Sequence, residues 1–402
     1  MKIALACPAS LPATQFGGIL ALCVDIARES SNSGHDTTIF TTDLDFANNL
    51  KTFNKNLPRT ESIENFKIKR SSVWFSVGLF YVNPGIYFDM LKEKCDVIHT
   101  IGVRSFQSYA AALVSKKRNI PLIISDQGGL TTHPDLKNNS LVRRIFYKLQ
   151  SPMIRFVIGQ SKKIIVANEY EKKIFSELTD ENKIEIVENG INLEKMKSNV
   201  KFKTKYSINH EYFLFLGRFH KVKGVDILLK AMQLIKNHHL ISDVKLVIMG
   251  VDFGFEDEML KMINEMDLDN VVKVIKNPPR EDVIAAYKES EFLVLPSRWE
   301  LSPLTPLEGF AFKKPTISTK AHGIPYTLED GKNSILVESE NFSELGNKII
   351  ELLNDKIKCK ELGMNGYEHI HKTCNSQEMV QHMLRIYEKV GWFYEKENNR
   401  RI

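Results

Sequence analysis

Short apolar runs alternate with helix-forming segments along this chain, and no other feature restricts its fold as strongly. The runs KIALAC (2–7), TTIFTT (37–42), DVIHTI (96–101) and PLIISD (121–126) are separated by stretches in which apolar residues recur with the period of a helix. Parallel strands require crossover connections, and helices supply them while covering both faces of the sheet. The first half of the chain is therefore predicted to form a doubly wound α/β domain.

The same alternation begins again in the second half, after a segment (188–212) in which apolar periodicity lapses and lysines accumulate. Its strands are predicted at 212–217, 244–250, 271–276 and 291–297. The 402 residues exceed what one hydrophobic core usually accommodates. We predict two Rossmann-like domains, 1–190 and 191–379, with a C-terminal helix at about 380–402 that can pack back on the first. Since ligands bind beyond the carboxyl ends of parallel strands, the expected site is an interdomain cleft.

Composition favours a cytoplasmic enzyme of ordinary globular character. The five cysteines are scattered without a CxxC pair, which argues against a disulfide framework or a zinc site and suits a reducing compartment. The start of the chain is interpreted as a buried strand in preference to a short signal peptide. The apolar stretch 72–91 is interrupted by Asn83-Pro84-Gly85 before it could span a bilayer, so no transmembrane segment is predicted.

Two glutamates eight positions apart mark the segment RWELSPLTPLEG (298–309). Thr305 and Glu308 fit a helix capping box, with a proline in the first helical position, and Glu300 falls in the preceding loop. In a purely structural interpretation Glu308 caps the helix and Glu300 is solvated. In a functional one, the helix start binds a phosphate, Glu300 accepts hydrogen bonds from sugar hydroxyls, and Glu308 holds a ribose diol. The pair alone favours neither.

Two cations in the segment GRFHKVKG (217–224) favour the functional interpretation. Arg218 and Lys223 follow a predicted strand in a glycine-containing turn, where a planar guanidinium and a point charge could together clamp a diphosphate. Their structural alternative is a pair of solvated surface charges.

At these motifs the chain resembles the retaining, nucleotide-sugar-dependent glycosyltransferases of family 4, which have the GT-B architecture. The resemblance is carried by FGGIL near the N-terminus, VENGIN, GRFHKVKGVDILLKA, and the run from PSRWELSPLTPLEG to GIP. It implies that Arg218 and Lys223 neutralise the donor diphosphate, that Glu300 lies against the donor sugar, and that Glu308 binds the nucleotide ribose. It also implies donor contacts from two further segments, namely Gly17-Gly18 and Ser302-Pro303-Leu304-Thr305.

The chain departs from the family pattern at several positions. Leu301 and Ser302 stand where glycine and an aromatic residue are usual, so donor sugar contacts can differ. Gln127 occupies the place of a histidine that contacts the donor sugar in many members. Asp126, Gln127 and His133 are therefore candidates for the acceptor side of the cleft. His99 matches a histidine common at its strand end, and catalytic and structural roles are equally open for it.

A basic tract without acidic residues extends from 136 to 168. Its cations are interleaved with apolar residues, as in a basic amphipathic helix. The seven cations are Lys137, Arg143, Arg144, Lys148, Arg155, Lys162 and Lys163. A solvated helix face and a peripheral contact of 137–163 with anionic lipid on the inner face of a membrane are both open, with the apolar run 74–88 as a neighbouring surface.

The expected reaction is transfer of a sugar from a nucleotide diphosphate sugar to a hydroxyl acceptor, for which a lipid-linked molecule is one candidate. Retention implies front-face substitution, in which the departing phosphate helps to deprotonate the incoming hydroxyl. No metal, separate cofactor or nucleic-acid partner is expected. The chain lacks the GxGxxG of a dehydrogenase. A glycan phosphorylase and a non-catalytic basic binding protein remain alternatives, and the sugar, base and acceptor are left open.

Overall fold

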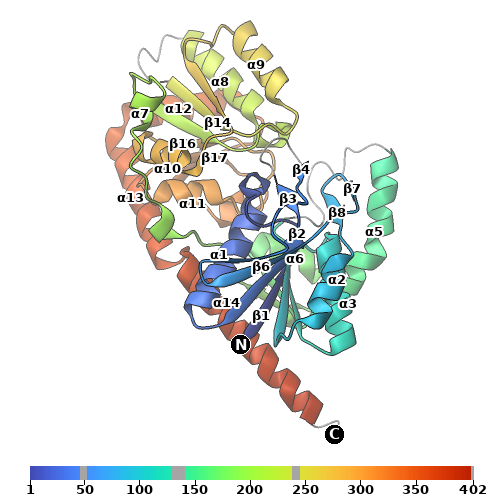
Figure 1. Cartoon of the computed structure of the whole chain (residues 1–402). Coiled ribbons are helices and arrows are strands. Elements are labelled where there is room, and N and C mark those ends of the chain that lie inside the picture. The colour runs from blue at the N-terminus through green and yellow to red at the C-terminus, as the bar shows by residue number, and fades with distance from the viewer. Residues whose placement is uncertain (46–51, 129, 131–140, 238–244, 400–402) are drawn as a thin grey trace. The chain divides into compact units, whose positions relative to one another are not determined.

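The computed structural model describes residues 1–45, 52–128, 130, 141–237 and 245–399, without the side chains of 15, 141–147, 237 and 392–399. Within it the chain forms two compact units (Figure 1). Unit 1 comprises Met1–Asn189 together with Ser376–Ile402, and unit 2 comprises Gly190–Asn375. The first crossing from one unit to the other lies in the segment where apolar periodicity lapses. The C-terminal helix α14 (Ser376–Asn399) packs on α1 (Gly18–Asn32) of unit 1.

Unit 1 is built on an eight-stranded sheet in the order β12-β11-β10-β9-β1-β2-β6-β5. Every neighbouring pair is parallel except β5 and β6, which form an antiparallel edge. The strands are β1 (Lys2–Ala6), β2 (Asp36–Thr42), β5 (Thr60–Ile63), β6 (Phe66–Ser71), β9 (Val97–Ile101), β10 (Leu122–Ser125), β11 (Lys163–Val166) and β12 (Ile184–Ile186). The predicted parallel sheet is confirmed, and the start of the chain is its central strand.

Both faces of this sheet are covered, because alternate side chains of each strand point to opposite sides. Ile3 and Leu5 of β1 enter one core, which α1 and α14 complete, whereas Ala4 and Ala6 enter the other. The remaining helices are α2 (Gly85–Lys92), α3 (Phe106–Arg118), α5 (Leu141–Gln160) and α6 (Glu169–Ser176), with short 3-10 turns η1 (Thr14–Phe16) and η2 (Glu181–Lys183). Two ribbons stand outside the sheet: β3 (Leu44–Asp45) with β4 (Thr52–Phe53), and β7 (Phe75–Val77) with β8 (Phe80–Val82).

Unit 2 contains a six-stranded sheet in the order β15-β14-β13-β16-β17-β18, and all its pairs are parallel. Its strands are β13 (Tyr212–Leu216), β14 (Lys245–Gly250), β15 (Val272–Lys276), β16 (Leu293–Leu295), β17 (Thr316–Thr319) and β18 (Ser334–Val337). Its helices are α7 (Phe202–Lys205), α8 (Val225–Asn237), α9 (Glu256–Glu265), α10 (Arg280–Glu289), α11 (Leu304–Phe310), α12 (Phe342–Asn354) and α13 (Lys356–Lys372), with 3-10 turns η3 (Leu193–Lys195), η4 (Lys221–Lys223) and η5 (Ile324–Tyr326). The second predicted alternation of strands and helices is thus confirmed.

The apolar stretch 72–91 does not form one continuous helix. It is divided between the β7–β8 ribbon and α2, whose N-cap is Pro84. Among the residues that the structure describes, no helix has both the length and the apolar character needed to cross a bilayer.

Candidate functional site

The two motif loops of unit 2 lie side by side because they follow adjacent strands. β13 pairs directly with β16, so the loops that leave their carboxyl ends emerge at the same edge of the sheet. We call residues 217–224 the clamp turn and residues 296–303 the glutamate loop. They are tied together by the N–H of Arg298, which donates to the carbonyl of Val222 at 2.8 Å.

Gly224 allows the clamp turn to approach the glutamate loop this closely. Its φ of +69° lies in the left-handed region, and a Cβ there would lie 1.9 Å from the carbonyl oxygen of Pro296. Any side chain would therefore force the two loops apart. The next residue, Val225, begins α8, where the sequence predicts a helix start.

Lys223 and Glu300 meet across this junction. The ammonium group of Lys223 donates to Glu300 Oε1, which also accepts from Ser297 Oγ at 3.0 Å. The side chains of Lys223 and Glu300 are 14% and 11% exposed. Glu300 is therefore not the solvated carboxylate of the structural interpretation. The two residues are brought together from positions 77 apart in the sequence.

A second cation belongs to the same cluster. The Arg218 guanidinium stacks over the ring of Phe253 at 5.0 Å. Burial lowers the pKa of Lys223, the charge and hydrogen bond of Glu300 oppose this change, and the positive charge of Arg218 adds to the lowering. The cluster thus contains two cations and one carboxylate, and a further anion would relieve the repulsion between Arg218 and Lys223.

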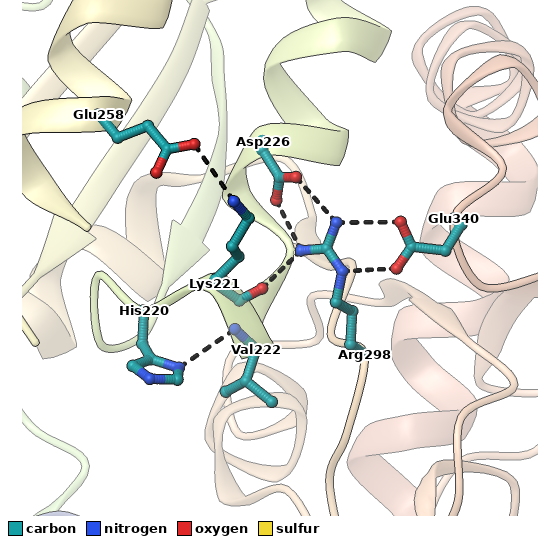
Figure 2. Close-up of polar contacts among 7 residues, drawn as sticks. All are labelled: His220, Lys221, Val222, Asp226, Glu258, Arg298 and Glu340. Atoms are coloured by element: carbon teal, nitrogen blue, oxygen red, sulfur yellow. Dashed lines mark hydrogen bonds and ion pairs between the residues drawn. The ribbon is translucent and has the colours of Figure 1, made fainter. Parts of the chain in front are cut away.

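Arg298 fixes the geometry of the clamp turn (Figure 2). Its guanidinium forms two hydrogen bonds with Asp226, at 2.7 and 2.8 Å, and two with Glu340, at 2.5 and 2.9 Å. It also donates to the carbonyl of Lys221. Burial alone would raise the pKa of Asp226, but the hydrogen bonds and charge of Arg298 outweigh it and hold that pKa below its usual range. Arg298 therefore joins the clamp turn, the first turn of α8 and the glutamate loop.

Lys221 belongs to the same turn but takes a different direction. The ammonium group of Lys221 lies 3.3 Å from Glu258 of α9 (Figure 2), and the Lys221 side chain is 62% exposed. Lys223 points toward Glu300 instead. One turn thus presents one solvated lysine and one nearly buried lysine.

The predicted capping box at α11 is wrong. The N-cap is Pro303, two residues before Thr305, and within the described part of the chain no side chain caps the helix. Glu308 instead pairs with both terminal nitrogens of Arg280 on α10, at 2.6 and 3.0 Å. A guanidinium fork offers a carboxylate two charge-assisted bonds, which explains why Glu308 does not fold back on the helix start.

The segment that leads into α11 is partly buried and firmly packed. Ser302, Leu304 and Thr305 are half-buried, and Pro303 is buried. Leu301 is buried, and a Cβ on Gly323 would lie 1.7 Å from its carbonyl oxygen. The N–H of Gly323 donates to the Glu300 carbonyl at 3.0 Å. The loop after β17 therefore holds the backbone of the glutamate loop in place.

In unit 1 the predicted glycine loop lies between η1 and α1. Gly17 is the N-cap of α1, with a φ of +98°, and Gly18 is the first residue of the helix. Among the described residues, and apart from the two chain neighbours of Gly17, no heavy atom lies within 4 Å of where its Cβ would be. The glycine is therefore required by its backbone conformation, and the space in front of it is open.

His99 lies in the core of unit 1. It is fully buried, its Nδ1 is 2.6 Å from the Tyr387 hydroxyl, and its Nε2 is 2.8 Å from Ser125 Oγ. Burial lowers the pKa of His99 to about 3, so the ring is neutral at physiological pH. With both ring nitrogens bonded inside the protein, the geometry favours the structural alternative for this histidine.

Asp126 and Gln127 follow β10 in a tight turn. Asp126 is buried and accepts from the N–H of Val103 at 3.1 Å. Gln127 has a φ of +56°, and its amide exchanges two hydrogen bonds with that of Asn189, at 3.0 and 2.8 Å. His133 lies outside the described residues. Of the three acceptor-side candidates, the structure thus places two, and both already have partners within unit 1.

Glu171 supports this turn from α6, and the sequence analysis missed it. Its carboxylate accepts from the N–H of Ala167 at 2.7 Å, and the backbone N–H groups of Gln127 and Gly128 also face it. Burial, followed by the charge of Asp126, raises the pKa of Glu171 to about 8, against the opposing effect of these N–H groups. The Asn168-Glu171 pair, three residues apart before an apolar segment, was a detectable capping signal.

Two family models together match residues 16–369 of the sequence. The model described as Glycosyltransferase Family 4 matches residues 16–195, and the one described as Glycosyl transferases group 1 matches residues 196–369. The chain belongs to the family 4 glycosyltransferases, as its motifs predict, and its two α/β units are those of the GT-B fold.

The sequence identity to three individual relatives is between 17% and 29%. The chain is 29% identical to an "Uncharacterized glycosyltransferase" of Methanocaldococcus jannaschii over 75% of this chain and 77% of that protein. It is 27% identical to a "Capsular polysaccharide biosynthesis glycosyltransferase" of Staphylococcus aureus, over 54% of this chain and 58% of the other. Among solved structures, Anabaena HepE in complex with UDP-glucose is similar with a TM-score of 0.74 and 17% identity, over 97% of this chain and all of HepE.

Proposed function

We propose that this glycosyltransferase moves a sugar from a nucleoside diphosphate donor to a hydroxyl acceptor, with retention at the anomeric carbon. One observation carries the proposal: Lys223 and Glu300 lie in contact beyond the carboxyl ends of adjacent parallel strands, with Arg218 close enough to affect Lys223. Two cations beside a carboxylate suit a ligand that carries a diphosphate and a polyhydroxylated ring.

The diphosphate would take the place between the two cations. Its negative charge would raise the pKa of Lys223 and hold the ammonium group protonated, reversing the effect of burial and of Arg218. During reaction the bond between the anomeric carbon and the phosphate oxygen breaks, and charge accumulates on that oxygen. Arg218 and Lys223 would stabilise this charge, as would the N–H groups at the uncapped start of α11.

Front-face substitution accounts for retention without a protein nucleophile. The acceptor oxygen bonds to the anomeric carbon on the side from which the nucleoside diphosphate departs, and the acceptor proton passes to the departing phosphate oxygen. Glu300 would accept hydrogen bonds from hydroxyls of the donor sugar. Glu308 would accept from the ribose, since each carboxylate oxygen keeps a lone pair while bonded to Arg280. The proposal needs neither a metal ion nor a separate cofactor.

Within unit 1, two features suit contact with a ligand. The open space before Gly17 suits close approach of a ligand to the backbone, and Gln127 would present its amide where many family members carry a histidine. We assign His99 no contact with substrate. The relative named for capsular polysaccharide biosynthesis supports a role in glycan assembly, and the base and sugar of HepE's ligand make UDP-glucose a first donor to test.

A thermal-shift screen of nucleoside diphosphates and their sugars tests the proposal. A ligand at about 100 times its dissociation constant should stabilise the protein by about 2.7 kcal/mol. Arg218→Ala should abolish the shift for the ligand that gives the largest one. Lys221→Ala is the matched control, because that lysine belongs to the same turn but extends to Glu258, and it should keep the shift. No shift with any nucleotide, or an equal shift in Arg218→Ala, would refute the proposal.

A further inference from the structure

Unit 1 exposes a compact group of large apolar side chains. They lie on the β7–β8 ribbon, its preceding residue and the neighbouring helix α2, and we call them the apolar ribbon. They are Trp74 (75% exposed), Phe75 (58%), Val77 (46%), Leu79 (51%) and Phe88 (59%). Isolated exposed apolar residues are ordinary, but five within fifteen positions (74–88) are a patch of the kind that meets another apolar surface.

The apolar ribbon is held firmly from beneath. Tyr81 of β8 is fully buried and packs against the rings of Phe16 and Phe53. Its carbonyl accepts from Gln107 Nε2 at 2.9 Å, which fastens β8 to the first turn of α3. Gly78, at a φ of +61°, turns the chain at the tip. The exposed side chains thus stand on an anchored base. The β7–β8 ribbon itself lies outside the eight-stranded sheet (Figure 1).

Charge is distributed unevenly around this patch. No charged residue occurs from 71 to 88, and the next, Asp89, is neutralised by Arg59 at 2.9 Å. At the same end of α3, Arg104 donates to Gln150 of α5. Gln150 directly follows two exposed residues, a lysine at 148 and a leucine at 149 that is 72% exposed. α5 therefore brings Lys148 toward the uncharged ribbon.

The predicted amphipathic character of α5 holds over the part whose side chains are described. Ile154, Val157 and Ile158 are buried in the core, while Lys148 and Arg155 are exposed. The segment from 136 to 168 contains seven basic residues and no acidic one. Lys163 lies beyond α5, in β11, and pairs with Glu185 at 3.1 Å, so the basic helix face is confined to α5. An apolar tip that includes Trp and Phe, near a helix whose charged residues are all basic, matches the boundary between acyl chains and anionic head groups.

We propose that the apolar ribbon inserts into the interfacial layer of an anionic bilayer while Lys148 and Arg155 of α5 contact its head groups. The absence of charge over the whole ribbon favours lipid over a protein partner, whose interface would carry a polar rim. The inference deepens the proposed function, since it rests on a sugar transfer whose hydroxyl acceptor is held at a membrane. Binding to lipid can nevertheless be measured without any turnover.

The test is flotation of the full chain with vesicles of phosphatidylcholine alone or mixed with phosphatidylglycerol. We expect binding to the mixed vesicles that weakens with salt, and about a tenfold or greater loss in the variant Trp74→Ser/Phe75→Ser/Leu79→Ser. Ile357→Ser is the matched control: that side chain is 81% exposed, belongs to unit 2, and should have no effect. Unchanged flotation of the triple variant would overturn the proposal.

A second measurement needs no disruptive variant. The emission of Trp74 should be quenched by brominated lipid in wild type, and the quenching should disappear in Trp74→Phe, which still floats. Sedimentation velocity tests whether a second copy of the chain binds the apolar ribbon instead. If wild type self-associates, the triple variant does not, and neither binds lipid, the patch is a dimer interface and the proposal is overturned. The thermal shift with nucleotides, measured on the triple variant, tests the proposed function separately. A retained shift shows that nucleotide binding does not depend on the apolar ribbon, whatever the result of flotation.

Discussion

The loops at the carboxyl ends of the two sheets use different chemistry. In unit 2, Lys223, Arg218 and Glu300 form a charged cluster whose lysine is held partly buried against its preference. In unit 1, His99 is neutral and Gln127 is paired with the amide of Asn189. Burial raises the pKa of Glu171, which favours its protonated form. A buried lysine whose pKa is lowered by burial and by a neighbouring cation indicates a binding site for an anionic ligand. A network of neutral groups that are hydrogen-bonded to one another indicates a structural role.

The contrast is tested most strongly by Lys223→Ala. If the charged cluster stabilises the leaving diphosphate, kcat should fall by about 10²- to 10³-fold, as on removal of a group that stabilises transition-state charge. Steady-state kinetics with the donor found by thermal shift gives the number. Lys221→Ala should change kcat little, since its exposed ion pair with Glu258 contributes about 0 to 1 kcal/mol to stability. Equal losses in both would remove the distinction between the two lysines.

Gly224→Ala should damage unit 2 without touching any charge. The new Cβ would meet the Pro296 carbonyl at 1.9 Å, and alanine disfavours the φ of +69°. We expect the free energy of unfolding to fall by about 3 kcal/mol, from backbone strain plus displacement of the clamp turn. Denaturant unfolding followed by fluorescence measures this. Gly254→Ala, also at a positive φ but in open space, should cost only the strain of its backbone.

Arg298→Ala should separate support from contact within unit 2. It leaves Asp226, which is 7% exposed, without its two charge-assisted bonds, and should destabilise the protein by about 2 to 3 kcal/mol. Because Arg298 holds the pKa of Asp226 low, the wild-type contribution is present at neutral pH and is lost as pH falls through that lowered pKa. The stability difference between wild type and variant should therefore shrink in acid. A pH-independent difference would contradict this origin.

Glu171→Gln should give the smallest effect and sharpen the description of unit 1. The folded-state pKa of about 8 lies above the ordinary value of 4.5, so the group's contribution is fully present below pH 4.5 and is lost as pH rises through 8. Between pH 6 and 8, wild type should lose about 2 kcal/mol relative to the glutamine variant. Parallel stability profiles would show that Glu171 is not protonated in the folded protein at pH 6.

Sequence patterns captured the frame of the molecule because period and spacing are local properties. Four parallel strands of each unit follow from runs of a few residues. The parallel strands β6, β11, β12, β17 and β18 were not predicted. The short ribbons and the antiparallel edge strand β5 were missed, since their side chains alternate too briefly to give a pattern. Nothing in the sequence predicted that the exposed ribbon would stand apart from the sheet.

The candidate site was predicted in part, for a related reason. Residue type and motif identified Lys223 and Glu300, but the partners that hold the loops are distant in the sequence. Arg298 and Asp226 are 72 residues apart, and Glu308 pairs with Arg280 instead of capping the helix. Such choices depend on which cation the fold brings within reach, and a capping pattern does not contain that information.

The position of α14 has a consequence for synthesis. Unit 2 is one continuous stretch whose ends are joined by a hydrogen bond from the Ile191 N–H to the Cys374 carbonyl, so all its parts exist before α14 is made. Unit 1 begins before unit 2, yet its core lacks Met383 and Tyr387 until α14 has been made, and Tyr387 is also the hydrogen-bond partner of His99. Unit 1 is therefore completed only after unit 2 has been made, and loss of the turns of α14 that carry Met383 and Tyr387 would damage unit 1, although these turns follow unit 2 in the sequence.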